Sequence, residues 1–206
     1  MRLLAYLAAI SLACAIGLGL GGWTAWRALT LDFFVDKIDL DEWSAFTELS
    51  DPGNNPYAAA KAAQLGGLPL GLAEGFTLSA TTDALGQRLR AGCNYTLSGS
   101  IPQARLWTLD AVGLQGDSLL AAQAPQTAIH SRAVVHTHRD ENSNADVDAI
   151  VIGVGPDPVS GNWMRVEGDR PMTLILRLYD TQVGSGVGVR EVALPRILPG
   201  RARTGC

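Results

Sequence analysis

The sequence PMTLILRLYD, residues 171–180, decides the fold class of this 206-residue chain. Its residues alternate in the period of two that is typical of a β-strand, and both sides of the strand carry apolar side chains. A strand of this kind belongs in the interior of a sandwich, with one side filling the core and the other half covered. The preceding EGDRP, residues 167–171, predicts a turn. The side expected to face the core consists of Met172, Leu174, Leu176 and Leu178.

Short β-prone segments, separated by glycine, proline and polar clusters, recur along the chain from Leu68 onward. This spacing predicts a mainly β fold, a jelly-roll-like antiparallel β-sandwich. One short helix is expected at residues 56–65, because Asn55 and Pro56 form a start signal and two glycines follow the alanine-rich run. The other expected strands are residues 76–81, 93–99, 104–112, 127–137, 147–155 and 190–195.

Residues 3–26 contain no charged side chain, and about 20 apolar residues suffice to cross a bilayer as a helix. A cleaved signal peptide is the alternative, but its apolar core runs only about 7 to 15 residues. Arg2 precedes the run and several acids follow Arg27, so we expect the N-terminus in the cytoplasm. The chain would be a single-pass inner-membrane protein with its C-terminal domain in the periplasm.

Three parts of the chain follow from this reading. Residues 1–28 form the transmembrane anchor, 29–55 a juxtamembrane connector, and 56–206 the periplasmic β-sandwich domain. Within the anchor, small residues recur every four positions, the spacing that lets two membrane helices approach closely. Glycine and alanine are also common in any membrane helix, so the stripe is open to either interpretation. It consists of Ala9, Ala13, Gly17 and Gly21.

A net charge of −4 argues against a nucleic-acid partner. The chain contains no nucleophile motif, no phosphate-binding glycine loop and no Cys-x-x-Cys. Of its three cysteines, Cys14 is expected in the membrane, which leaves Cys93 and Cys206 in an oxidising compartment. We expect a disulfide between these two. A free terminal thiol and an intermolecular bridge are the alternatives.

Two clusters have the residue types of metal ligands. The histidines His130, His136 and His138 would share one side of a strand, but His130 lies too far along it to share a metal without a bulge. We expect solvent-facing histidines near a strand end. An acidic segment has oxygen-bearing side chains at alternate positions, as in a calcium loop: Asp140, Asn142, Asn144, Asp146 and Asp148.

The calcium-loop pattern fails at two positions of that segment. Ala145 stands where the sharp turn needs glycine, and Val151 stands where the bidentate glutamate belongs. The segment therefore predicts a solvated loop between two strands, and we expect no metal site.

Three segments, YTLSGSIPQARLWTLDAVGLQG (95–116), GNWMRVEGDRPMTLILRLYD (161–180) and LPRI (194–197), resemble the bacterial family catalogued as domain of unknown function 1214. The segment from Asn55 to Gly99 resembles the small membrane-anchored branch of that family. The resemblance covers about residues 50–206 and implies a jelly-roll β-sandwich, as in larger relatives that carry a second domain. It brings no catalytic residues. We expect structural roles for the motif residues Asn162, Trp163 and Arg177.

The sequence thus favours a binding or structural module of the cell envelope, without catalytic residues or a cofactor. Its expected partners are the lipid bilayer, through the N-terminal helix, and a membrane or periplasmic protein or a second copy of the chain. The alternative is an envelope enzyme acting on a small carbohydrate or lipid-derived substrate. Polar groups converging in a pocket would favour the enzyme, and a flat apolar patch would favour the binding module.

Overall fold

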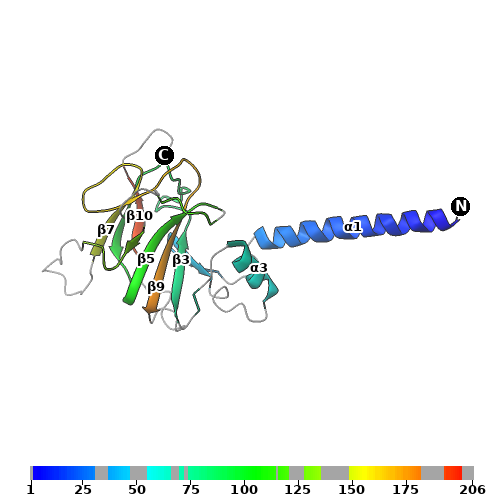
Figure 1. The fold of residues 1–206 in the computed structure, drawn as a ribbon, viewed down its shortest axis with the longest axis horizontal. Helices are drawn as coiled ribbons and strands as arrows, with labels where there is room; N and C mark the ends of the chain where they lie inside the picture. The colour runs from blue at the N-terminus through cyan, green and yellow to red at the C-terminus, as the bar shows by residue number, and fades with distance from the viewer. Residues whose placement is uncertain are drawn as a thin grey trace.

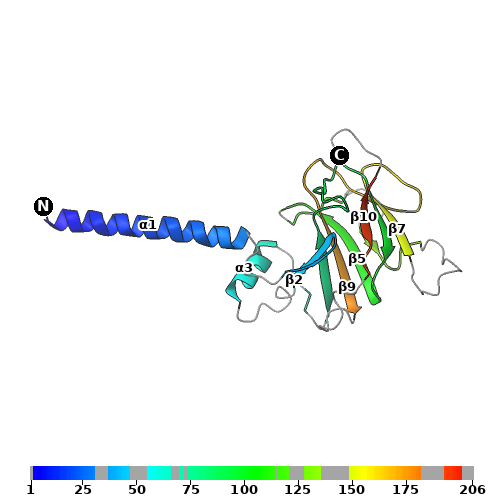
Figure 2. The ribbon, with the colours of Figure 1, turned by 180° about the vertical axis from the view of Figure 1, so that it is seen from behind.

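The computed structural model describes residues 2–30, 37–46, 55–65, 70–71, 74–114, 116–120, 128–135, 149–181 and 193–200. A long helix, α1 (Arg2–Thr30), extends away from a β domain built of two sheets, and a short helix, α3 (Pro56–Leu65), lies between the two (Figure 1). The view from behind shows the same arrangement, with the two sheets stacked as layers (Figure 2). The mainly β fold predicted from the sequence is confirmed.

The larger sheet has six strands, and every pair of neighbours in it is antiparallel. In order across the sheet they are β1 (Lys37–Leu40), β2 (Trp43–Phe46), β3 (Gly75–Ala80), β9 (Thr173–Thr181), β5 (Ala104–Val112) and β6 (Ile129–His130).

The smaller sheet has four strands, and one of its pairs, β7–β8, is parallel. In order they are β10 (Arg196–Pro199), β4 (Tyr95–Ser100), β7 (Ala149–Gly155) and β8 (Asn162–Arg165).

Strand β9 lies inside the larger sheet, as its alternating sequence predicts. It pairs with β3 from Gly75↔Tyr179 to Ala80↔Leu174, and with β5 along almost its whole length. Leu174, Leu176 and Leu178 have no exposed surface. The prediction of an interior strand with a leucine side in the core is therefore confirmed.

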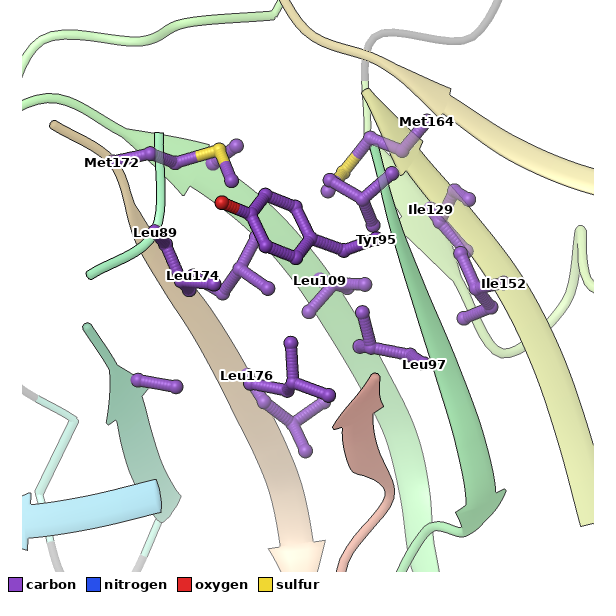
Figure 3. Close-up of a cluster of buried hydrophobic side chains, with 14 of the residues drawn as sticks. Leu89, Tyr95, Leu97, Leu109, Ile129, Ile152, Met164, Met172, Leu174 and Leu176 are labelled. Atoms are coloured by element: carbon purple, nitrogen blue, oxygen red, sulfur yellow. The ribbon is translucent and has the colours of Figure 1, made fainter. Parts of the chain in front are cut away.

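The core lies between the two sheets and forms one cluster (Figure 3). Leu109 and Leu176 come from the six-stranded sheet, while Leu97 and Ile152 come from the four-stranded sheet. Tyr95 projects its ring into the same space, beside Met172 and Leu89. Burying so many large apolar side chains is the main favourable term for the domain, because each contributes roughly 1.5–3 kcal/mol relative to exposure.

Helix α3 begins as the sequence predicts. The Asn55 side-chain oxygen accepts hydrogen bonds from the amides of Tyr57 and Ala58 at 3.0 and 3.3 Å. These bonds satisfy amides that have no partner in the first turn. Pro56 occupies the first helical position, where its missing N–H costs nothing.

Three strands differ from the sequence prediction. Strand β6 covers two residues of the predicted 127–137, because the chain turns at once: the Ala133 amide donates to the His130 carbonyl at 2.9 Å. The last strand is Arg196–Pro199 instead of 190–195. Strand β8 was predicted only as a segment that packs on the sandwich. All three departures lie in short edge strands, where tertiary contacts outweigh residue preference.

The β1–β2 hairpin lies within residues 29–55, the segment predicted as a connector. Trp43 and Ala45 are each 1% exposed and belong to the core cluster. Asp41, the first of the two residues between the strands, has a φ of 53°, a left-handed conformation that aspartate tolerates better than most residues. The connector thus supplies an edge of the six-stranded sheet.

Candidate functional site

The side of the six-stranded sheet that faces away from the core is here called the outer face. Its residues alternate along each strand with the buried ones, so their placement follows from strand geometry. All of them are half-buried. On the four strands β3, β9, β5 and β6 it consists of Thr77, Ser79, Ile175, Arg177, Tyr179, Leu106, Thr108, Asp110 and His130.

Pairing across the strands brings Arg177 to the middle of this face. Its direct neighbours are Thr77 on β3 and Thr108 on β5, and Thr108 in turn faces His130 on β6. A row of four polar side chains therefore crosses the outer face. The row was not predicted, because sequence alone does not give the register between strands.

Arg177 forms an ion pair with Asp110, in which its Nη1 donates a hydrogen bond to Oδ2. The two side chains are 28% and 26% exposed, whereas Arg105 and Asp180 in a pair nearby are 77% and 71% exposed. Partial burial screens the Arg177–Asp110 pair less from solvent than a surface pair. Asp110 also neutralises the charge that an anionic ligand would need at Arg177.

Apolar side chains border this ion pair on the same face. Leu106 lies directly opposite Tyr179, and Ile175 lies directly opposite Asp110. Tyrosine and arginine are enriched in protein interfaces, and partners bind through mixed apolar and polar surfaces of this kind. The chemistry of the outer face therefore fits a protein partner better than a small anion.

Asn162, from the sequence motif, lies at the start of β8 and is buried. Its Nδ2 donates to the carbonyls of Val135 and Val151 at 2.8 and 3.0 Å, and its Oδ1 accepts from the Val135 amide at 2.8 Å. Trp163 donates from Nε1 to the Gly155 carbonyl at 3.1 Å. Both motif side chains thus join backbone segments.

Two buried titratable groups lie at one end of the core. Burial raises the pKa of the Tyr95 hydroxyl, which accepts a hydrogen bond from the Arg90 amide at 3.0 Å. The Asp83 carboxylate accepts from the amides of Leu85 and Gln87, both at 2.9 Å. These bonds hold the turn at residues 83–87, so both groups have partners within the fold.

The predicted histidine cluster is described in part. His130 lies on β6 at the outer face, while His136, His138 and the acidic segment 140–148 lie outside the described residues. Within the described ranges, no group of three histidine, cysteine or acidic side chains is placed to hold a metal ion.

The cysteines of the β domain are also described in part. Cys93 is buried, next to Asn94, whose carbonyl accepts a hydrogen bond from the Gly200 amide at 2.7 Å. Cys206 lies outside the described residues, so its pairing with Cys93 stays a prediction. Cys14 in α1 is a free, exposed thiol.

Residues Arg2–Ala28 of α1 have the length and composition of a membrane-crossing helix, and a signal sequence has the same properties. Trp23 and Trp26 are exposed near its C-terminal end. The predicted stripe of small residues lies along this helix, and nothing comes within 4 Å of a Cβ built at Gly17 or Gly21. Its packing role stays a prediction.

The family described as "Protein of unknown function (DUF1214)" matches residues 74–183, and the chain belongs to this family. Two solved structures are similar to it. The VPA0106 protein from Vibrio parahaemolyticus shares 18% identity at a TM-score of 0.50 over 72% of this chain, which spans about a third (36%) of that protein.

The second structure is a putative uncharacterized protein from Burkholderia cenocepacia, with 15% identity and a TM-score of 0.40 over 64% of this chain and 31% of that one. The search of the curated proteins found no match. The likeness to the Vibrio protein supports the fold and carries no activity with it.

Proposed function

We propose that this protein is a single-pass membrane-anchored binding module of the cell envelope. Helix α1 is its uncleaved anchor, with the N-terminus in the cytoplasm and the β domain in the periplasm. The support is the 29-residue helix, its exposed Trp23 and Trp26 near the end that leads to the domain, and the acidic segment that follows Arg27. Residues 1–28, 29–55 and 56–206 remain the proposed anchor, connector and domain.

The binding surface is the outer face of the six-stranded sheet, and its partner is a protein of the same membrane or compartment, or a second copy of the chain. One observation carries this assignment: the centre of the face combines an internally neutralised ion pair, Arg177–Asp110, with the apolar pair Leu106 and Tyr179. Arg177 keeps a structural role there, because Asp110 occupies it.

Co-purification of the detergent-extracted full chain tests the binding surface. Tyr179→Ala should reduce the amount of bound partner at least tenfold and leave the melting temperature close to that of the wild type. Tyr57→Ala, the same substitution on exposed α3, is the control and should leave the partner bound. Equal recovery of partner with both variants would contradict the assignment.

A separate experiment tests the anchor. A reporter that is active only outside the cytoplasm, fused after Cys206, should be active in cells. The protein isolated from membranes should retain residues 1–20. An inactive reporter, or a mature N-terminus beyond residue 20, would contradict the anchored topology.

A further inference from the structure

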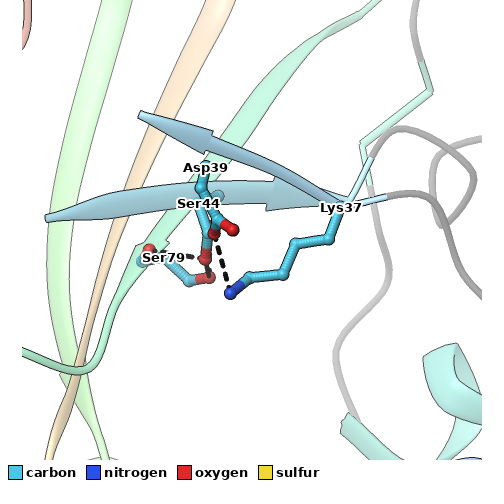
Figure 4. Close-up of polar contacts among 4 residues, drawn as sticks. All are labelled: Lys37, Asp39, Ser44 and Ser79. Carbon is cyan, nitrogen blue, oxygen red and sulfur yellow. Dashed lines mark hydrogen bonds and ion pairs between the residues drawn. The ribbon is translucent and has the colours of Figure 1, made fainter. Parts of the chain in front are cut away.

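The β1–β2 hairpin is the first strand structure after α1, and only residues 31–36 separate the two. Figure 4 shows the hairpin running across the strand that carries Ser79, with Lys37 and Asp39 forming an ion pair of 2.8 Å on its outer strand. The hairpin thus lies at the edge of the sheet where the chain arrives from the membrane helix.

Side chains of the hairpin connect it to both sheets. Trp43 enters the core and donates from Nε1 to the Pro195 carbonyl at 2.7 Å, just before β10 of the four-stranded sheet. The Glu42 carboxylate accepts from Arg196 Nε at 3.2 Å, and its side chain is only 7% exposed. The hairpin therefore closes the side of the sandwich between β3 and β10.

The backbone contact of the hairpin with the sheet is small by comparison. Strand β2 pairs with β3 at one position, Ser44↔Ser79, whereas β3 and β9 pair at six positions. The two serine side chains add hydrogen bonds, with Oγ atoms 3.3 Å apart. Detaching the hairpin breaks these few contacts and leaves the ladders of β3, β9 and β5 intact.

We infer that the β1–β2 hairpin is a strap that releases from the sandwich as one unit, and that a pull from the α1 side of the chain promotes its release. Such a pull reaches β1 first, because β1 follows α1 in the chain. Release removes Trp43 and Ala45 from the core cluster and uncovers apolar surface between β3 and β10. This inference is independent of the partner surface proposed above.

Amide hydrogen exchange of the full chain in lipid nanodiscs tests the strap. Sub-global opening of one unit gives its amides a common exchange rate, faster than that of the body of the sheet. We expect residues 38–45 to exchange at least tenfold faster than residues 174–178. Trp43→Phe, which loses one buried hydrogen bond, should accelerate the hairpin about fivefold further and leave residues 174–178 unchanged.

Two further variants make the outcome decisive. Trp107→Phe, the same substitution in β5, should not accelerate the hairpin relative to the wild type. A disulfide formed in Ser44→Cys/Ser79→Cys should slow residues 38–45 to the rate of residues 174–178. The inference is overturned if the hairpin and β9 exchange at one rate in the wild type, if Trp43→Phe accelerates both equally, or if the disulfide leaves hairpin exchange unchanged.

Discussion

Asn162 pairs with Val135 through its side chain as a neighbouring strand would pair through its backbone. Its Oδ1 accepts the Val135 N–H and its Nδ2 donates to the Val135 carbonyl, each at 2.8 Å, while a third bond reaches the Val151 carbonyl. One side chain thereby satisfies backbone groups of two segments. This bonding supports the structural role expected for the motif residue.

Asn162→Ala should therefore lower the free energy of unfolding by about 2 to 4 kcal/mol, because it removes three hydrogen bonds and leaves partly buried backbone groups without partners. Trp163→Phe, which loses one bond, should cost about 1 kcal/mol. Urea unfolding of both variants measures the difference. A cost for Asn162→Ala no larger than that for Trp163→Phe would contradict this role.

Strand β9 offers a test of its two sides. Leu176→Ala empties a fully buried site and should cost about 2 to 5 kcal/mol in the free energy of unfolding. Ile175→Ala, the neighbouring residue on the outer face, should cost clearly less because Ile175 is only half-buried. Equal costs in thermal or urea unfolding would show that the outer face is as closely packed as the core.

The centre of the fold was predictable and its edges were not. Residues 172–178 alternate so regularly that one pattern gave the strand, its interior position and its buried side. Strand β8, in contrast, depends on a parallel pairing with β7 and on the Asn162 bonds, neither of which has a local sequence signal. Strand β10 is fixed by its register with β4, at Arg196↔Ser98, far away in the chain.

The candidate site was predictable only in part. Arg177 attracts attention as the one charged side chain of its strand, and Asp110 is the one acid within β5. Nothing in the sequence indicates that they meet, because the register of β5 on β9 decides it. The same holds for His130, which comes to the outer face through two paired residues.

The predicted disulfide between Cys93 and Cys206 has support from the register of β10. Pro199 pairs with Tyr95, and the Gly200 amide bonds to Asn94, so the chain six residues before Cys206 lies beside the neighbour of Cys93. Closing a loop of more than 100 residues would stabilise the domain by about 4 to 5 kcal/mol in the chain-entropy model.

Intact mass measurement of the unreduced protein should then show the loss of two hydrogens and a single thiol open to alkylation, at Cys14. Cys206→Ser should lower the melting temperature, while Cys14→Ser should leave it unchanged. Alkylation of all three cysteines without a reductant would contradict the pairing.

Tyr95 gives the stability of the domain a dependence on alkaline pH. Burial raises the pKa of its hydroxyl above the ordinary 10.0, and the hydrogen bond from the Arg90 amide opposes this only in part. The folded chain then keeps the phenol proton at a pH where the unfolded chain loses it. The contribution is full below the unfolded pKa and is lost as the pH rises through the folded pKa.

Tyr95→Phe should therefore make the loss of stability between about pH 9 and about pH 11 shallower than in the wild type. Tyr57→Phe, on exposed α3, should keep the wild-type slope. Urea unfolding across this range measures both slopes. An unchanged slope in Tyr95→Phe would show that another group governs the alkaline loss.

The central claim, that the outer face of the six-stranded sheet binds a protein, is tested most directly by site-specific photo-crosslinking in intact cells. A photoreactive amino acid in place of Tyr179 should give a discrete adduct, with twice the mass of the chain if the partner is a second copy. The same group in place of Val151, exposed on the four-stranded sheet, should give none. No adduct from position 179, or the same adduct from both positions, would contradict the claim.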